Sequence, residues 1–221
     1  MSNKQRGHRT GRNTRPPART TSAWVWVAVF LAAIVALGLL ARVGAASSAP
    51  ILQQGKALGK NAFQAGDTGS GGQGQAIDQI SCDSGSQVNY HYHAHLSLFV
   101  QGQQIALPMA IGIVQPQLKG ANGFVDSGNC LYWLHTHDAS GIIHIESPIA
   151  GPFTLGNFFD IWGEPLTQAG FAGYKGKLYV YVGGKLFHGN VRGLKLTAHE
   201  EITLALDKPV KPPSYRWPSG L

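Results

Sequence analysis

The sequence predicts a mainly β (α+β) fold: an antiparallel sheet or sandwich-like domain with one short helix, preceded by a single transmembrane helix. Apolar or alternating segments separated by Gly-containing turns recur between positions 90 and 207, which is typical of hairpin strands. Within this region only residues 154–163 show helical periodicity. A charge-free apolar run near the N-terminus is long enough to cross a bilayer.

The first 41 residues predict a membrane anchor. Residues 1–22 are a basic tail without an acidic residue, and residues 23–41 carry no charge. As a helix this run would be about 28 Å long, close to the hydrocarbon thickness of a bilayer. Basic residues before such a run stay in the cytoplasm, so we expect a single-pass protein of the cell membrane with an extracytoplasmic C-terminal domain. The alternative is a signal peptide cleaved near residues 43–45.

Composition divides the remaining chain into a linker, a domain and a tail. Residues 42–79 are rich in Gly, Ser and Gln and predict a flexible linker. Residues 80–207 predict the folded domain. Residues 208–221 contain four prolines and are expected to run extended, across the domain surface.

The net charge of +7 does not indicate a nucleic-acid partner. Seven of the 18 Lys and Arg residues precede position 43, so the other 11 are balanced by the 11 Asp and Glu residues of the chain. A neutral domain has little attraction for a phosphate backbone. The membrane and a metal ion are therefore the partners that the sequence predicts, and a protein partner is left unspecified.

Within the domain, turn signals pair the predicted strands. Residues 90–100 and 103–108 flank a Gly-containing turn, residues 131–137 and 141–147 flank "DASG", and residues 177–189 are divided by Gly183 and Gly184. Residues 201–207 are a last strand. In the helix, Thr154 can act as the N-cap and Gly163 can end it.

Six of the nine histidines fall on three of these strands, at spacings of two residues. They are His91, His93, His95, His135, His137 and His144. Side chains two apart on a strand point to one face, so each strand presents a row, and Glu146 shares the row of His144. Clustered histidines would repel one another when protonated and lose hydration when buried, and a metal ion removes both problems.

Neutral imidazole is a ligand for transition metals, and copper or zinc is the cofactor we expect. Six histidines exceed the needs of one ion, so either two ions bind or some histidines support the others. Glu146 can be a ligand, a general base or half of an ion pair. Asp138 can orient a ligand or open a turn, and Met109 can be a soft copper ligand or a core residue. His188 and His199 are expected to be ordinary polar residues.

Cys82 and Cys130 are the only cysteines. In an oxidising compartment they are expected to form a disulfide. The alternative makes Cys130 a thiolate ligand, but its position five residues before His135 is the wrong parity for a shared strand face.

The blocks "YHYHAHLSLFVQGQQIALPMAIGI", "CLYWLHTHDASGIIHIESP", "FTLGNFFDIWGEPL" and "LTAHEEITLAL" resemble an uncharacterised family of membrane-anchored or secreted bacterial and archaeal proteins. The resemblance spans about residues 88–207. It implies that this domain is a recurring unit.

Three functions fit these features. The first is a tethered extracytoplasmic domain that binds, delivers or senses copper or zinc. The second is a metal-dependent hydrolase or oxygenase with an open metal position and Glu146 as acid/base. The third is a partner-binding module with a structural metal. The sequence does not decide whether the protein is an enzyme.

Overall fold

The structure is a computed structural model that describes residues 71–84, 88–120 and 123–221. All of them belong to one compact unit, Ile51–Leu221. The predicted membrane span, residues 23–41, and most of the predicted linker lie outside the described residues. Within the described part of the chain, no helix is both long and apolar enough to cross a membrane.

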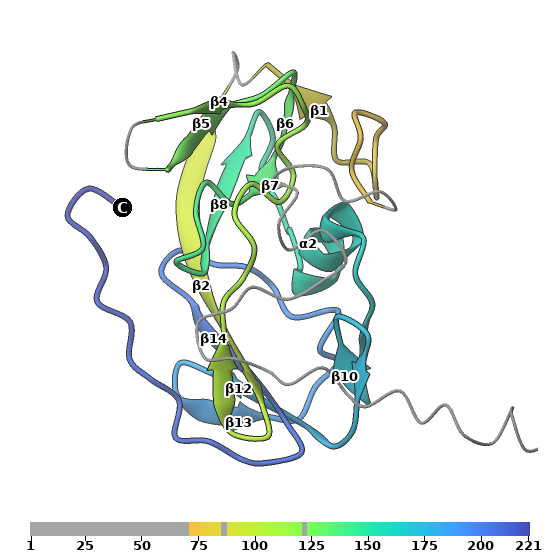
Figure 1. The fold of residues 1–221 in the computed structure, drawn as a ribbon, viewed down its shortest axis with the longest axis vertical. Coiled ribbons are helices and arrows are strands. Elements are labelled where there is room, and N and C mark those ends of the chain that lie inside the picture. Colours follow the sequence, from red (N-terminus) through yellow and green to blue (C-terminus); the bar gives the residue numbers. More distant parts are fainter. Residues whose placement is uncertain (1–70, 85–87, 121–122) are drawn as a thin grey trace, which may run out of the picture. The chain divides into compact units, whose positions relative to one another are not determined.

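The described elements are short strands and one helix (Figure 1). In chain order they are β1 (Cys82–Asp83), β2 (Tyr90–Val100), β3 (Gln103–Ile105), β4 (Leu118–Lys119), β5 (Val125–Ser127), β6 (Leu131–Tyr132), β7 (Leu134–His135), β8 (Ile142–Ser147), α2 (Leu155–Trp162), β9 (Leu166–Thr167), β10 (Gly170–Phe171), β11 (Tyr174–Lys175), β12 (Leu178–Val182), β13 (Lys185–Phe187) and β14 (Glu201–Leu206). The mainly β class with one short helix is confirmed.

A seven-stranded sheet in the order β13-β12-β14-β2-β8-β7, with β3 also paired to β2, forms the centre of the domain. The predicted hairpins are present as β2–β3, β7–β8 and β12–β13. The sheet is mixed, because β14 pairs with β2 in parallel. Smaller two- and three-stranded sheets complete the architecture.

The helix α2 begins and ends where its sequence signals predict. Thr154 accepts a hydrogen bond from the Asn157 backbone N–H, and the Asn157 side chain accepts one from the Thr154 N–H, which together form a capping box. Gly163 ends the helix in the left-handed conformation, at φ 76°. The apolar side of α2, with Phe158 and Trp162 fully buried, joins the main core and contacts β7.

Both ends of the predicted domain receive contacts from the neighbouring segments. In the segment assigned to the linker, the Gly72 N–H donates to Ile161 O, and Gln75 O accepts a hydrogen bond from the Tyr132 hydroxyl. In the Pro-rich tail, the Tyr215 ring stacks on His95 with centroids 3.8 Å apart. Cys82 and Cys130 form a disulfide, which confirms the predicted pairing and makes the thiolate-ligand alternative for Cys130 wrong.

Candidate metal centre

Strand register, and for His137 the loop after β7, bring five of the six predicted histidines together with Glu146. The strand β8 lies between β2 and β7. His144 on β8 pairs with His93 on β2 and with His135 on β7. Glu146 pairs with His91 on the β2 side. The histidines of β2, β8 and β7 are therefore neighbours across the three strands.

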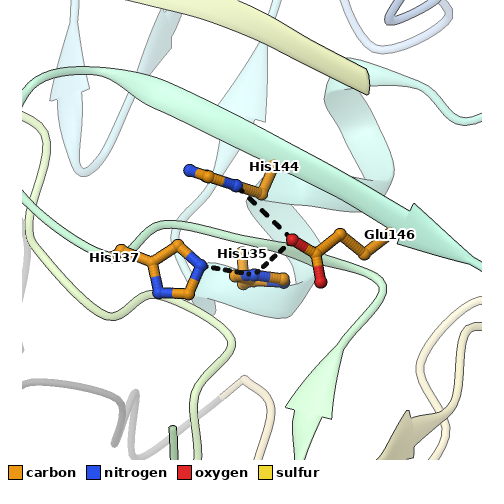
Figure 2. A group of neighbouring side chains, drawn as sticks. All are labelled: His135, His137, His144 and Glu146. Atoms are coloured by element: carbon orange, nitrogen blue, oxygen red, sulfur yellow. Dashed lines mark hydrogen bonds and ion pairs between the residues drawn. The ribbon is translucent and has the colours of Figure 1, made fainter. Parts of the chain in front are cut away.

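Four of these side chains form an inner group, drawn in Figure 2: His135, His137, His144 and Glu146. Nε2 of His135 lies 3.1 Å from Nε2 of His137 and 3.9 Å from Oε1 of Glu146. The same carboxylate oxygen lies 3.6 Å from Nδ1 of His144. The three histidines are buried, whereas the side chain of Glu146 is 23% exposed. Solvent therefore reaches the inner group at the carboxylate.

The position of His137 depends on the loop that follows β7 rather than on the strand itself. The predicted strand over 131–137 is interrupted at Trp133 and ends at His135. Thr136, between the two histidines, is fully buried, and its hydroxyl accepts a hydrogen bond from the Ile111 N–H and donates one to Pro108 O. These bonds fix the backbone that carries both imidazoles.

Backbone carbonyls determine which ring nitrogen of His135 and of His137 carries the hydrogen. Nδ1 of His135 lies 2.8 Å from Tyr132 O, and Nδ1 of His137 is hydrogen-bonded to Val125 O. Since a carbonyl oxygen can only accept, both Nδ1 atoms donate, and in the neutral rings both Nε2 atoms bear lone pairs. These lone pairs face each other across the 3.1 Å contact with no hydrogen between them. A cation between the two rings would relieve this repulsion.

Burial keeps His93, His135 and His137 neutral. Burial and the neighbouring His137 lower the pKa of His135 to about 3, and burial together with His144 and His91 lowers the pKa of His93 to about 4. Burial also lowers the pKa of His137. The neighbouring histidines, His144 first, lower the pKa of Glu146 to about 2 against the opposing effect of burial. At neutral pH His135 and His137 are therefore neutral imidazoles and Glu146 is an ionised carboxylate, the forms that bind metal.

His91 and His93 form a second group with His144. Nε2 of His93 lies 3.1 Å from Nε2 of His91 and 3.1 Å from Nδ1 of His144. Nε2 of His91 also lies 3.2 Å from Oε1 of Glu146, and its side chain is 52% exposed. This group is therefore open to solvent at His91.

His95 points into different surroundings, although it follows His93 on the same strand face. Its Nε2 donates to Ser140 O at 3.0 Å, and its ring stacks on Tyr215. It belongs to neither group of possible ligands among the described residues. The contact with the tail is one that spacing within a strand does not reveal.

The remaining polar and sulfur-containing candidates lie in neither group of possible ligands among the described residues. Oδ1 of Asp138 accepts a hydrogen bond from the Ser140 N–H, as expected of a turn residue. Met109 packs against a small core of Ala110, Ile113 and Val125. His188 is exposed, and Nε2 of His199 donates to Leu221 O at 3.0 Å.

The fold and the site together define a mainly β domain whose histidine and glutamate cluster could hold a metal ion. No protein-family model, curated protein or solved structure gives a significant match to this chain.

Proposed function

We propose that this protein is a membrane-tethered, extracytoplasmic domain that binds a transition metal, copper or zinc, for metal binding, delivery or sensing. The inner group of His135, His137, His144 and Glu146 would hold the ion. The observation that carries the proposal is the pair of Nε2 atoms that face each other without a hydrogen between them.

The inner group has the chemistry and the spacing of a metal site. Ligands bonded to a tetrahedral ion at 2.0–2.1 Å lie roughly 3.3 Å apart, close to the 3.1 Å between the Nε2 atoms of His135 and His137. Three imidazoles and one carboxylate suit zinc or copper. The hydrogen bonds to Tyr132 O and Val125 O orient the ligands, as partners of ligating histidines do in metalloproteins.

The membrane location of the domain rests on other observations. The uncharged run at 23–41 and the basic residues before it favour an uncleaved anchor with a cytoplasmic N-terminus. The Cys82–Cys130 disulfide supports an oxidising compartment for the domain. The resemblance of residues 88–207 to membrane-anchored or secreted proteins points the same way.

Metal content tests the proposal. The full chain is purified in detergent without an affinity tag, loaded with Zn²⁺ or Cu²⁺, dialysed against a weak chelator and analysed by mass spectrometry of the elements. We expect the parent protein and His188→Ala, in which an exposed histidine outside the cluster is removed, to retain metal. His135→Ala and His137→Ala should lose most of it. Metal in the parent at the level of a buffer blank, or unchanged metal in both cluster variants, would contradict the proposal.

A metalloenzyme is the second candidate, and the position of Glu146 favours it. Its side chain is the most exposed of the inner group, and its carboxylate lies beside the ring nitrogens of His135 and His144. A group placed there can accept a proton from a molecule that reaches the ion from solvent. In that case Glu146→Gln should keep the bound metal and abolish an activity, whereas a role in binding alone predicts a parallel loss of both.

A further inference from the structure

The outer histidines carry a second unsatisfied contact. Nε2 of His93 faces two ring nitrogens at once, Nε2 of His91 and Nδ1 of His144, each at 3.1 Å. A ring nitrogen has one position in the ring plane, which holds either a hydrogen or a lone pair. His93 can therefore form a normal hydrogen bond with only one of these neighbours, and the other contact is left without one.

The carboxylate of Glu146 does not supply the missing hydrogen bond, because its oxygen can only accept. Its Oε1 is an acceptor, 3.2 Å from Nε2 of His91 and 3.6 Å from Nδ1 of His144. A hydrogen that His91 donates to Glu146 is no longer available to His93. An ion placed between His91, His93 and His144 would meet all three nitrogens through their lone pairs.

We propose that this face binds a second transition-metal ion, held by His91, His93 and His144, beside the ion of the inner group. The proposal rests on the metal-binding function argued above. With His144 assigned to the outer ion, the inner ion keeps His135, His137 and Glu146. Each ion then has three protein ligands and an open position, which is the arrangement of reactive rather than purely structural sites.

Glu146 lies between the two sets of ligands. Its Oε1 is within 3.9 Å of His135 on the inner side and 3.2 Å of His91 on the outer side. A carboxylate so placed offsets the repulsion between two cations, and paired ions in two-metal sites lie about 3.5–4 Å apart. The outer ion should bind more weakly, because it binds next to an existing cation and because His91 is half exposed.

Stoichiometry and magnetic coupling test the second site. The full chain in detergent, without a tag, is titrated with Zn²⁺ for metal counting and with Cu²⁺ for electron paramagnetic resonance. We expect two equivalents of metal in two steps. The spectrum of the first Cu²⁺ should be that of an isolated ion, and the second should broaden it by coupling between neighbouring ions.

The variant His91→Ala/His93→Ala should bind one equivalent and give only the uncoupled Cu²⁺ spectrum. His91→Ala alone should lower the affinity of the second step. Because His91 is exposed, this single variant should fold normally, and it tests the outer site even if the double variant does not fold. His188→Ala should retain both equivalents. One equivalent in the parent, unchanged in the double variant, would overturn the second site and leave the proposed function intact. Two equivalents in the double variant would also overturn it, and no metal in the parent would overturn both.

Discussion

The metal-free domain should lose stability in mild acid, and the magnitude follows from the burial of His135. Its side chain is 1% exposed, and its pKa is lowered from the ordinary 6.5 to about 3. Between these values the unfolded chain binds a proton that the folded chain excludes. Folding stability therefore falls as the pH drops below about 6.5. A pH of 5 lies about 1.5 units below the pKa of His135 in the unfolded chain. Protonation of this one residue should therefore lower the free energy of unfolding by about 2 kcal/mol.

His93 changes the stability in the same direction, whereas Glu146 has little effect in this range of pH. His93, with a pKa lowered to about 4, adds to the loss over the same range of pH. The pKa of Glu146 is lowered to about 2 from 4.5. The stability that this shift provides is present above pH 4.5 and is lost only at lower pH, below the range of the test. Bound metal should protect the fold, because it occupies the nitrogens that protons would take.

Urea unfolding with a chelator present, at pH 7 and pH 5, measures the effect. For a domain of this size a loss of about 2 kcal/mol moves the midpoint down by roughly 1 M urea. His135→Asn, whose side-chain amide nitrogen takes the place of Nδ1 and can donate to Tyr132 O, should show a smaller pH dependence, and His188→Ala should behave as the parent. A midpoint that is unchanged or higher at pH 5 in the metal-free parent would refute the reasoning.

Three further predictions concern the disulfide, the turn at Gly112 and the Glu146 carboxylate. Replacing Cys82 and Cys130 by Ala removes a crosslink of 48 residues and should cost about 4 kcal/mol of stability in urea unfolding; equal midpoints for the two proteins would contradict this. Gly112 has φ +73°, and a Cβ there would lie 2.6 Å from a backbone oxygen of β7, whereas Gly173 has φ +83° and open space. Gly112→Ala and Gly173→Ala both carry the strain of positive φ, of about 1–2 kcal/mol, but only Gly112→Ala adds the close contact. Thermal unfolding should therefore show a clearly larger loss of stability for Gly112→Ala, and equal losses would argue against the close contact. Glu146→Gln should weaken Zn²⁺ binding in a chelator competition by at least the roughly 10–100-fold that follows loss of a hydrogen-bond partner of a ligand, and an unchanged affinity would show that the carboxylate is not a ligand.

Local signals in the sequence predicted the strands of the main sheet and the helix, but not the short strands β1, β4, β5, β9, β10 and β11. The Gly183-Gly184 turn, the Thr154 cap and the Gly163 stop each depend on residues close in the chain, and the structure has them. The parallel pairing of β14 with β2 was not predicted. A parallel neighbour is brought in by a long connection, and no short turn marks it in the sequence.

The candidate site shows the same division. Alternation along each strand predicted the rows of histidines, but their alignment depends on the register of β8 against β2 and β7. The carbonyl partners, Tyr132 O and Val125 O, could not be predicted, because every residue carries a carbonyl and only the fold selects two. His95 shares the predicted face, yet the tail residue Tyr215 covers it.

The two carbonyls explain how a buried histidine cluster can favour a metal ion over protons. Each holds a hydrogen on Nδ1 of His135 or His137, so the free lone pairs are directed into the group rather than away from it. Protonating these nitrogens places charge in a buried site beside other imidazoles, which lowers the pKa of His135. One ion can engage several lone pairs at once and replaces their mutual repulsion by bonds. Acid sensitivity without metal and the proposed binding of a metal ion therefore depend on the same geometry, and a variant that weakens one should weaken the other.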